Sequence, residues 1–127
     1  TSSGIRHYRK KFDLNHVRFF KNMVPNDFLR LLYNSIALIG NSSAGIRECA
    51  FLGVKAVNIG NRQEGRDRGT NVVDVDYDRI KIKEAILELI NSKRPEQNYL
   101  YGEGSSGKKI ADILASTKLP YSKILQY

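Results

Sequence analysis

Two short apolar runs, each followed by polar residues, constrain the fold of this chain more than any other feature. Residues 36–39 (Ile-Ala-Leu-Ile) are followed by Gly-Asn-Ser-Ser, and residues 55–59 (Lys-Ala-Val-Asn-Ile) by a loop rich in arginine. Short continuous apolar runs are typical of strands that are covered on both faces of a parallel sheet. The sequence therefore predicts an α/β fold with helices on both faces of a parallel sheet.

Segments with helical periodicity alternate with these strands. Pro25 suits the first turn of a helix, where its missing N–H costs nothing, and Gly53 suits the residue just after one. We expect helices over residues 3–12, 25–33, 44–52, 79–91 and 108–116, and strands over residues 16–20, 36–39, 55–59 and 71–75. This alternation with short connections favours right-handed βαβ crossovers.

Three of these helices carry an apolar stripe that we expect to face inward. The stripes consist of Ile46, Cys49 and Ala50; of Ile82, Ile86, Leu89 and Ile90; and of Ile110, Ile113 and Leu114.

The size and composition of the chain exclude several classes of protein. With 127 residues, 41% of them hydrophobic, the chain is expected to form one globular domain over residues 1–118, with a tail at 119–127 that docks elsewhere. The single cysteine, Cys49, excludes an internal disulfide framework and a cysteine metal cluster. No apolar run approaches the roughly 20 residues that span a bilayer, and no signal-peptide pattern is present. We therefore expect a cytoplasmic protein without a membrane partner. Because the chain begins at Thr1, we also expect it to be a piece of a longer protein.

The net charge of +8 is concentrated at the start of the chain. Residues 1–21 hold six Lys or Arg and one acid, Asp13. Such a cluster is compatible with a nucleic-acid surface or with the solvated face of a helix. Because no nucleic-acid motif or stacking platform accompanies it, we expect no nucleic-acid partner.

The turn that follows the first apolar run has the composition of an anion site. Residues 40–45 combine Ser42 and Ser43 with two glycines and lead directly into a predicted helix. Unpaired N–H groups at a helix start bind phosphate, and Gly45 lets a bulky anion approach the backbone. The alternative is that one of the serines is only a helix N-cap.

The predicted helix after this turn carries an acid in its first turns. Glu48 can stabilise the positive end of the helix dipole, or it can accept hydrogen bonds from the vicinal hydroxyls of a ribose, as acids do in nucleotide sites. Both roles remain open from the residues alone.

The second apolar run leads into an arginine-rich loop. Residues 61–69 (NRQEGRDRG) contain Arg62, Arg66 and Arg68, and guanidinium groups suit phosphate oxygens. The alternative is a solvated loop in which Glu64 and Asp67 pair with the arginines.

Three segments together resemble one family of enzymes. The segments IGNSSAGIREC, GVKAVNIGNRQEGRDRGTNVVDV and YGEGSSGKKIADIL are similar to the C-terminal domain of the hydrolysing UDP-N-acetylglucosamine 2-epimerases, from about His16 to Leu114. Non-hydrolysing relatives carry Asp-Ser-Gly-Gly at the turn where this chain has Asn41, Ser42 and Ser43. The resemblance therefore points to the hydrolysing branch. One departure is Lys55, which stands where the family usually has proline.

The resemblance implies a fold and a set of UDP-binding residues. The fold is GT-B, in which two Rossmann-like domains face a cleft; this chain would be most of the C-terminal domain. Ser42 and Ser43 match the serines that hold the diphosphate, and Glu48 matches the acid on the ribose. Arg62 matches an arginine that lines the nucleotide site, and the main chain at Met23 lies near the uracil. Supporting roles fall to Arg47, Gln63 and Arg66.

The resemblance also implies a reaction. Members of the family eliminate UDP across C1–C2 of the sugar and hydrate the resulting glycal to free N-acetylmannosamine, in sialic- and nonulosonic-acid synthesis. The acid and base residues lie in the N-terminal domain, so we expect no catalytic residue here, and no cofactor or metal. We expect this piece to bind UDP weakly and to turn nothing over, and the full-length protein to be a homo-oligomer.

Three other functions remain open from the sequence. The first is a UDP-sugar glycosyltransferase of the GT-B fold. The second is a basic nucleic-acid-binding module built on residues 1–21. The third is an interaction fragment that uses the apolar tail.

Overall fold

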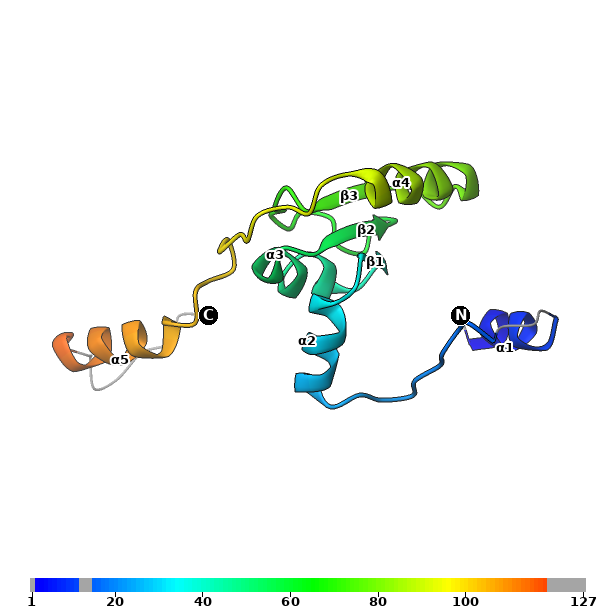
Figure 1. Ribbon diagram of the computed structural model, residues 1–127. Helices are drawn as coiled ribbons and strands as arrows, with labels where there is room; N and C mark the ends of the chain where they lie inside the picture. Colours follow the sequence, from blue (N-terminus) through cyan, green and yellow to red (C-terminus); the bar gives the residue numbers. More distant parts are fainter. Residues whose placement is uncertain (1, 12–14, 119–127) are drawn as a thin grey trace, which may run out of the picture.

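A three-stranded parallel sheet forms the centre of the molecule, which is a computed structural model that describes residues 2–11 and 15–118 (Figure 1). The strands are β1 (Ala37–Gly40), β2 (Lys55–Ile59) and β3 (Val72–Val75), in the order β1-β2-β3. Leu38 lies opposite Ala56, which lies opposite Val72. The predicted α/β fold with a parallel sheet is thus confirmed, with small shifts in the ends of the strands.

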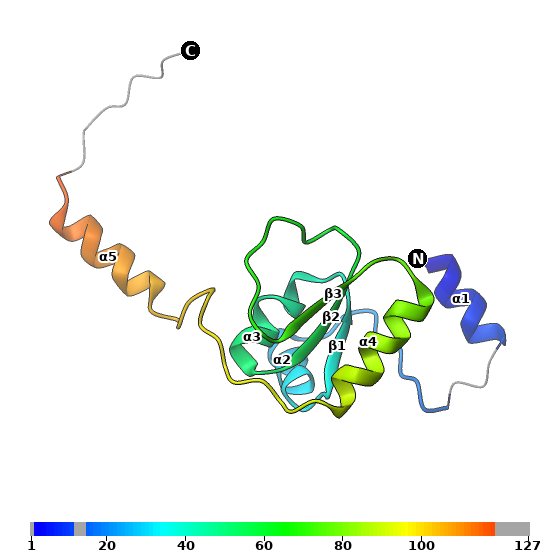
Figure 2. The ribbon, with the colours of Figure 1, turned by 90° about the horizontal axis from the view of Figure 1, so that it is seen from above.

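Helices pack on both faces of the sheet. On one face, α2 (Pro25–Tyr33) and α3 (Glu48–Leu52) enclose a core that consists of the buried residues Leu32, Cys49, Val54 and Ala56. On the other face, α4 (Arg79–Asn91) covers Val57 with Ala85 and Leu89. Figure 2 shows the sheet between α4 and the pair formed by α2 and α3. Alternate side chains of β2 therefore serve two different cores.

The ends of these helices follow from local residues. Asp78 caps α4, because its carboxylate accepts hydrogen bonds from the backbone N–H groups of Ile80 (2.8 Å) and Lys81 (2.9 Å). These bonds, that of Lys81 first, lower the pKa of Asp78. Gly53 ends α3 with a left-handed φ of 63°, and a Cβ there would lie 2.8 Å from the carbonyl oxygen of Pro95. Glycine is therefore required at this position.

One predicted strand is wrong. Residues 16–20 form no strand and join no sheet in the described part of the chain, and Phe20 is 62% exposed. β-branched and aromatic residues favour a strand only where a neighbouring strand supplies ladder hydrogen bonds.

The predicted helix over residues 44–52 is divided in two. A 3₁₀ turn, η1 (Ser43–Gly45), comes first and α3 begins only at Glu48. Gly45 lies against β2, where a Cβ would be 3.2 Å from that of Ala56. The chain therefore packs on the sheet before it turns into α3. The inward stripe is confirmed, because Ile46, Cys49 and Ala50 are all buried.

Two helices lie away from the sheet (Figures 1 and 2): α1 (Ser2–Lys11) and α5 (Ser106–Ser116). The predicted stripe of α5 faces no core, since Ile110, Ile113 and Leu114 are each more than half exposed. Ile90 of α4 is also exposed, contrary to expectation. The predicted tail at 119–127 lies outside the described residues. None of the described helices combines the length and the apolar composition needed to cross a bilayer.

Candidate functional site

The serine turn and the arginine loop meet at the carboxyl end of the sheet. The turn follows β1 and the loop follows β2, and these strands are parallel neighbours. Arg62 Nη1 donates a hydrogen bond to Asn41 Oδ1 (3.5 Å), and Gln63 Nε2 donates one to the carbonyl oxygen of Asn41 (2.9 Å). Polar groups that are far apart in sequence are thus adjacent at the edge where ligands of parallel α/β sheets bind.

The two serines of the turn differ in their hydrogen bonds. Ser42 caps η1, since its hydroxyl accepts a bond from the Ala44 N–H at 3.3 Å. The half-buried Ser43 has a hydroxyl that bonds to no other described residue. Gly45 is buried against β2 and therefore has a packing role. The N-cap interpretation accounts for Ser42 and leaves Ser43 unexplained.

Glu48 lines a cavity of about 390 Å³ whose walls come from α2, α3 and residues 98–106. Its Oε2 atom is buried and has no hydrogen-bond partner within residues 2–11 and 15–118. The neighbouring Arg47 lines the same cavity and is exposed. The remaining lining residues are Leu29, Phe51, Leu52, Asn98, Tyr101, Gly102, Gly104 and Ser106. A buried carboxylate oxygen without a donor favours a ligand that brings hydroxyl or N–H groups.

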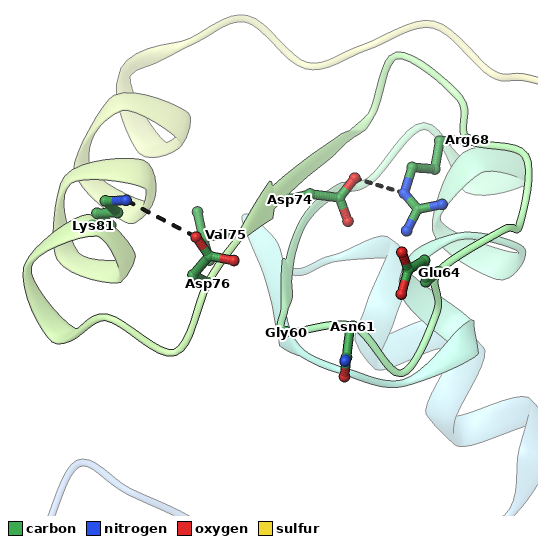
Figure 3. Close-up of a pocket in the computed structure, with 8 residues that line it drawn as sticks. All are labelled: Gly60, Asn61, Glu64, Arg68, Asp74, Val75, Asp76 and Lys81. Carbon is green, nitrogen blue, oxygen red and sulfur yellow. Dashed lines mark ion pairs between the residues drawn. The ribbon is translucent and has the colours of Figure 1, made fainter.

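Figure 3 shows a second cavity, also of about 390 Å³, beyond the ends of β2 and β3. Arg68 lines it and is held by the protein: its Nε lies 2.6 Å from Asp74 Oδ2, and its Nη2 donates to the carbonyl oxygen of Gln63 (2.9 Å). The alternative in which Glu64 and Asp67 pair with the arginines is wrong for Arg68, which pairs with Asp74 of β3 instead. Arg68 is therefore a structural residue of the loop.

Several predicted residues do not line the Glu48 cavity. Met23 is half-buried just before α2, and Arg66 is exposed on the loop. Neither of them, nor Arg62, is among the residues around the cavity. The structure thus places Arg62 and Gln63 at the serine turn and Arg47 with Glu48 at the cavity, and it brings Met23 and Arg66 to neither group.

The residues that form the second wall of the cavity were not predicted from the sequence. Tyr101 and Ser106 lie in the segment that carried the family resemblance, but the resemblance gave them no role. The signal was present in two glycines that flank Glu103. Gly102 and Gly104 have φ values of 109° and 88°, and they turn the chain between Tyr101 and α5.

Cys49 lies beside this site but is not a nucleophile. Burial, and secondarily the charge of Glu48, raises the pKa of its thiol to about 12. A thiol that stays protonated at neutral pH is unreactive, so Cys49 serves the core.

Comparison with known proteins places the chain in a family. Residues 1–115 match the family of UDP-N-acetylglucosamine 2-epimerases. The chain is 35% identical, over 86% of its length and 29% of the relative's, to the UDP-N,N'-diacetylbacillosamine 2-epimerase (hydrolyzing) of Legionella pneumophila. It is 32% identical to the polysialic acid biosynthesis protein P7 of Escherichia coli, over 94% of this chain and 26% of the relative.

A third relative is the UDP-N-acetylglucosamine 2-epimerase of Neisseria meningitidis, which is 32% identical over 68% of this chain and 24% of its own length. The chain thus spans less than a third of each of these relatives. Because the family match covers nearly all of the 127 residues, the chain belongs to the UDP-N-acetylglucosamine 2-epimerase family.

Proposed function

We propose that this chain is the UDP-binding part of a hydrolysing UDP-N-acetylglucosamine 2-epimerase. The observation that carries the proposal is the Glu48 side chain, which lines the cavity and has a buried Oε2 atom with no hydrogen-bond donor among the described residues. The two vicinal hydroxyls of a ribose are donors of the kind that such a group needs. An acid of this kind is what nucleotide sites at the carboxyl ends of parallel strands use.

The other predicted residues are assigned to the diphosphate and the uracil of the ligand. Ser42 and Ser43 would hold the diphosphate at the start of η1, and Arg62 would contact the outer phosphate oxygens. Gly45, predicted to let the anion approach the backbone, instead packs this turn against β2. Main-chain groups at Met23 would contact the uracil. Supporting roles are assigned to Arg47, Gln63 and Arg66. Of these, Gln63 already fixes the loop to Asn41.

The chemistry would be elimination followed by hydration. A base takes the C2 proton, the C1–O bond breaks with its electron pair going to the UDP oxygen, and a C1=C2 double bond forms. Water then adds a hydroxyl at C1 and a proton at C2 on the opposite face. The role of this chain is to stabilise the leaving diphosphate, while the acid and base would come from a second domain of a GT-B protein. The product N-acetylmannosamine would enter sialic- or nonulosonic-acid synthesis.

The hydrolysing branch is favoured by Asn41-Ser42-Ser43 and by the similarity to the hydrolysing epimerase of Legionella. We further propose that the 127 residues form a domain over 1–118 that binds UDP weakly alone and turns nothing over. The complete protein would be a cytoplasmic homo-oligomer.

Calorimetric titration with UDP tests the binding proposal. We expect the longest natural chain that carries these residues to bind UDP and to lose binding when Ser43→Ala and Glu48→Ala are combined. Glu96→Ala removes an exposed glutamate that does not line the cavity and should leave binding unchanged. Binding of duplex DNA with a steep salt dependence, and no response to UDP, would contradict the proposal.

Product analysis tests the reaction. The same protein is given UDP-N-acetylglucosamine in D₂O without an acceptor, and in parallel the diacetamido-trideoxy donor named for the Legionella relative. Release of UDP with the 2-epimer of the sugar, carrying deuterium at C2, supports the proposal and identifies the substrate. An intact donor favours a glycosyltransferase.

A further inference from the structure

We propose that Tyr101 is a positioning residue that ties the arginine loop, residues 61–69, to the wall of the Glu48 cavity. The inference rests on the proposed function, since it takes the cavity and the loop to hold the nucleoside and the diphosphate of one ligand. Tyr101 would hold the nucleoside part and the diphosphate part of the site at a fixed position relative to each other.

Tyr101 makes a contact on each side of this junction. It lines the cavity together with Glu48 and Phe51. Its hydroxyl donates a hydrogen bond of 2.7 Å to the backbone carbonyl oxygen of Asp67, in the arginine loop. The Tyr101 side chain thus connects the wall of the Glu48 cavity to the backbone of the arginine loop.

The segment that carries Tyr101 is fixed to α3 just upstream. The Asn98 N–H donates to the carbonyl oxygen of Ala50 at 2.9 Å. The rings of Tyr99 and Phe51 pack edge to face, with centroids 5.6 Å apart. Because α3 also carries Glu48, the Tyr101 hydroxyl links the loop to the same helix that holds the predicted ribose ligand.

The loop has few other attachments near Asp67. Gln63 fixes its beginning to Asn41, and Arg68 fixes its end to Asp74. Between them, in the part of the chain that the structure describes, residues 64–67 receive one side-chain hydrogen bond from outside the loop, that of Tyr101. Arg66 is held within the loop, because its N–H donates to the carbonyl oxygen of Gln63 (3.4 Å) and its own carbonyl oxygen accepts a hydrogen bond from Arg68. The Tyr101 hydroxyl is the bond that fixes this part of the loop to the cavity wall.

This arrangement predicts a loss that is specific to the phosphate half of the ligand. In UDP the spacing between ribose and phosphates is fixed by covalent bonds, so a displaced loop weakens the grip on phosphate and leaves the nucleoside contacts intact. Loss of one hydrogen bond that orders a binding loop corresponds to a decrease in affinity of about three- to tenfold.

The test compares UDP with uridine, which lacks phosphate. Tyr101→Phe removes only the hydroxyl. Tyr99→Phe is the matched control, because the Tyr99 hydroxyl donates a hydrogen bond of 3.1 Å to Gln97 Oε1 and Tyr99 does not line the cavity. In the longest natural chain that carries these residues, we expect Tyr101→Phe to bind UDP about three- to tenfold more weakly and uridine equally well. Tyr99→Phe should bind both ligands like the unsubstituted chain.

A second measurement does not depend on a ligand. Amide hydrogen exchange over residues 61–69 should become faster in Tyr101→Phe and stay unchanged in Tyr99→Phe. Unchanged exchange, unchanged UDP affinity, or an equal loss for UDP and uridine would each overturn the positioning role. Failure of the unsubstituted chain to bind UDP would overturn the proposed function, and this inference with it.

Discussion

The two ends of the sheet use the same kinds of side chain in opposite ways. At the amino end, the buried Lys55 donates hydrogen bonds to the carbonyl oxygens of Leu89 (2.6 Å) and Ser92. Arg94 donates to those of Gly53 (2.8 Å) and Tyr33 (3.0 Å). Two cations there satisfy the carbonyl groups at the ends of α2, α3 and α4.

At the carboxyl end, polar atoms remain unsatisfied. Glu48 Oε2 and Gln63 Oε1 are buried without a partner among the described residues. The Arg47 and Arg66 side chains donate to no residue that the structure describes. Buried polar atoms are nearly always paired, so each of these two oxygens can accept a hydrogen bond from a donor outside the described residues. At the amino end, Asn71 Oδ1 is the one buried side-chain atom of the described residues that is unpaired in the same way.

The largest expected change in stability comes from a substitution at the amino end of the sheet. Lys55→Ala removes the donor from two carbonyl groups at the end of α4, so the free energy of unfolding should fall by about 3 kcal/mol in urea denaturation. UDP affinity of the folded protein should not change. Lys93→Ala removes an exposed lysine nearby and serves as the control. A loss no larger than in this control would show that Lys55 is dispensable there.

A substitution of Glu48 at the carboxyl end should change UDP affinity without lowering the free energy of unfolding. Glu48→Gln keeps the shape of the side chain but removes the charge of a half-buried carboxylate whose Oε2 atom is buried and unpaired among the described residues. We expect UDP affinity to fall about tenfold while the free energy of unfolding stays equal or rises. Calorimetry and urea denaturation measure the two quantities, with Glu96→Gln as the control. Parallel loss of both would assign Glu48 a structural role.

Titration of Cys49 should change the free energy of unfolding by about 1 kcal/mol. Folding raises the pKa of its thiol from 9.0 to about 12, so the folded chain retains a proton that the unfolded chain releases. The linked stability is complete below the unfolded value and is lost as the pH rises, by about 1 kcal/mol between pH 8 and 10. Subtracting the same pH series for Cys49→Ala removes the contributions of lysines and tyrosines. Identical pH dependence in both proteins would contradict this account.

The smallest effect distinguishes the two serines. Ser42→Ala removes the cap of η1 and should lower the free energy of unfolding by about 0.5 kcal/mol, whereas Ser43→Ala should leave it unchanged. Both variants should weaken UDP binding. Equal stability changes in the two variants would remove the distinction.

Sequence periodicity predicted those elements whose stability comes from their own residues and one face of the sheet. The strand over 55–59 and the helix over 79–91 lie where predicted, because continuous burial and a helical stripe are local patterns. Residues 16–20 have the composition of a strand, but no described strand lies beside them. The helix over 44–52 is divided at Gly45 by its contact with β2, which periodicity within a segment does not record.

The candidate site was predictable in part for the same reason. The serine turn and Glu48 stand next to strand and helix ends that the sequence marks. The pairing of Arg68 with Asp74 and the bond from Tyr101 to Asp67 join residues that only the register and a distant turn bring together. Such contacts require the fold to be known first.

The connection between β2 and β3 contains no helix, and this has a consequence for how it can evolve. Its shape depends on anchors at Gln63, Arg68 and Asp67, which are spaced along a few residues. An inserted or deleted residue between two anchors would release at least one of them, whereas the exposed side chain of Glu64 anchors nothing among the described residues. Natural variants of this connection are therefore expected to differ by substitution and to keep a constant length.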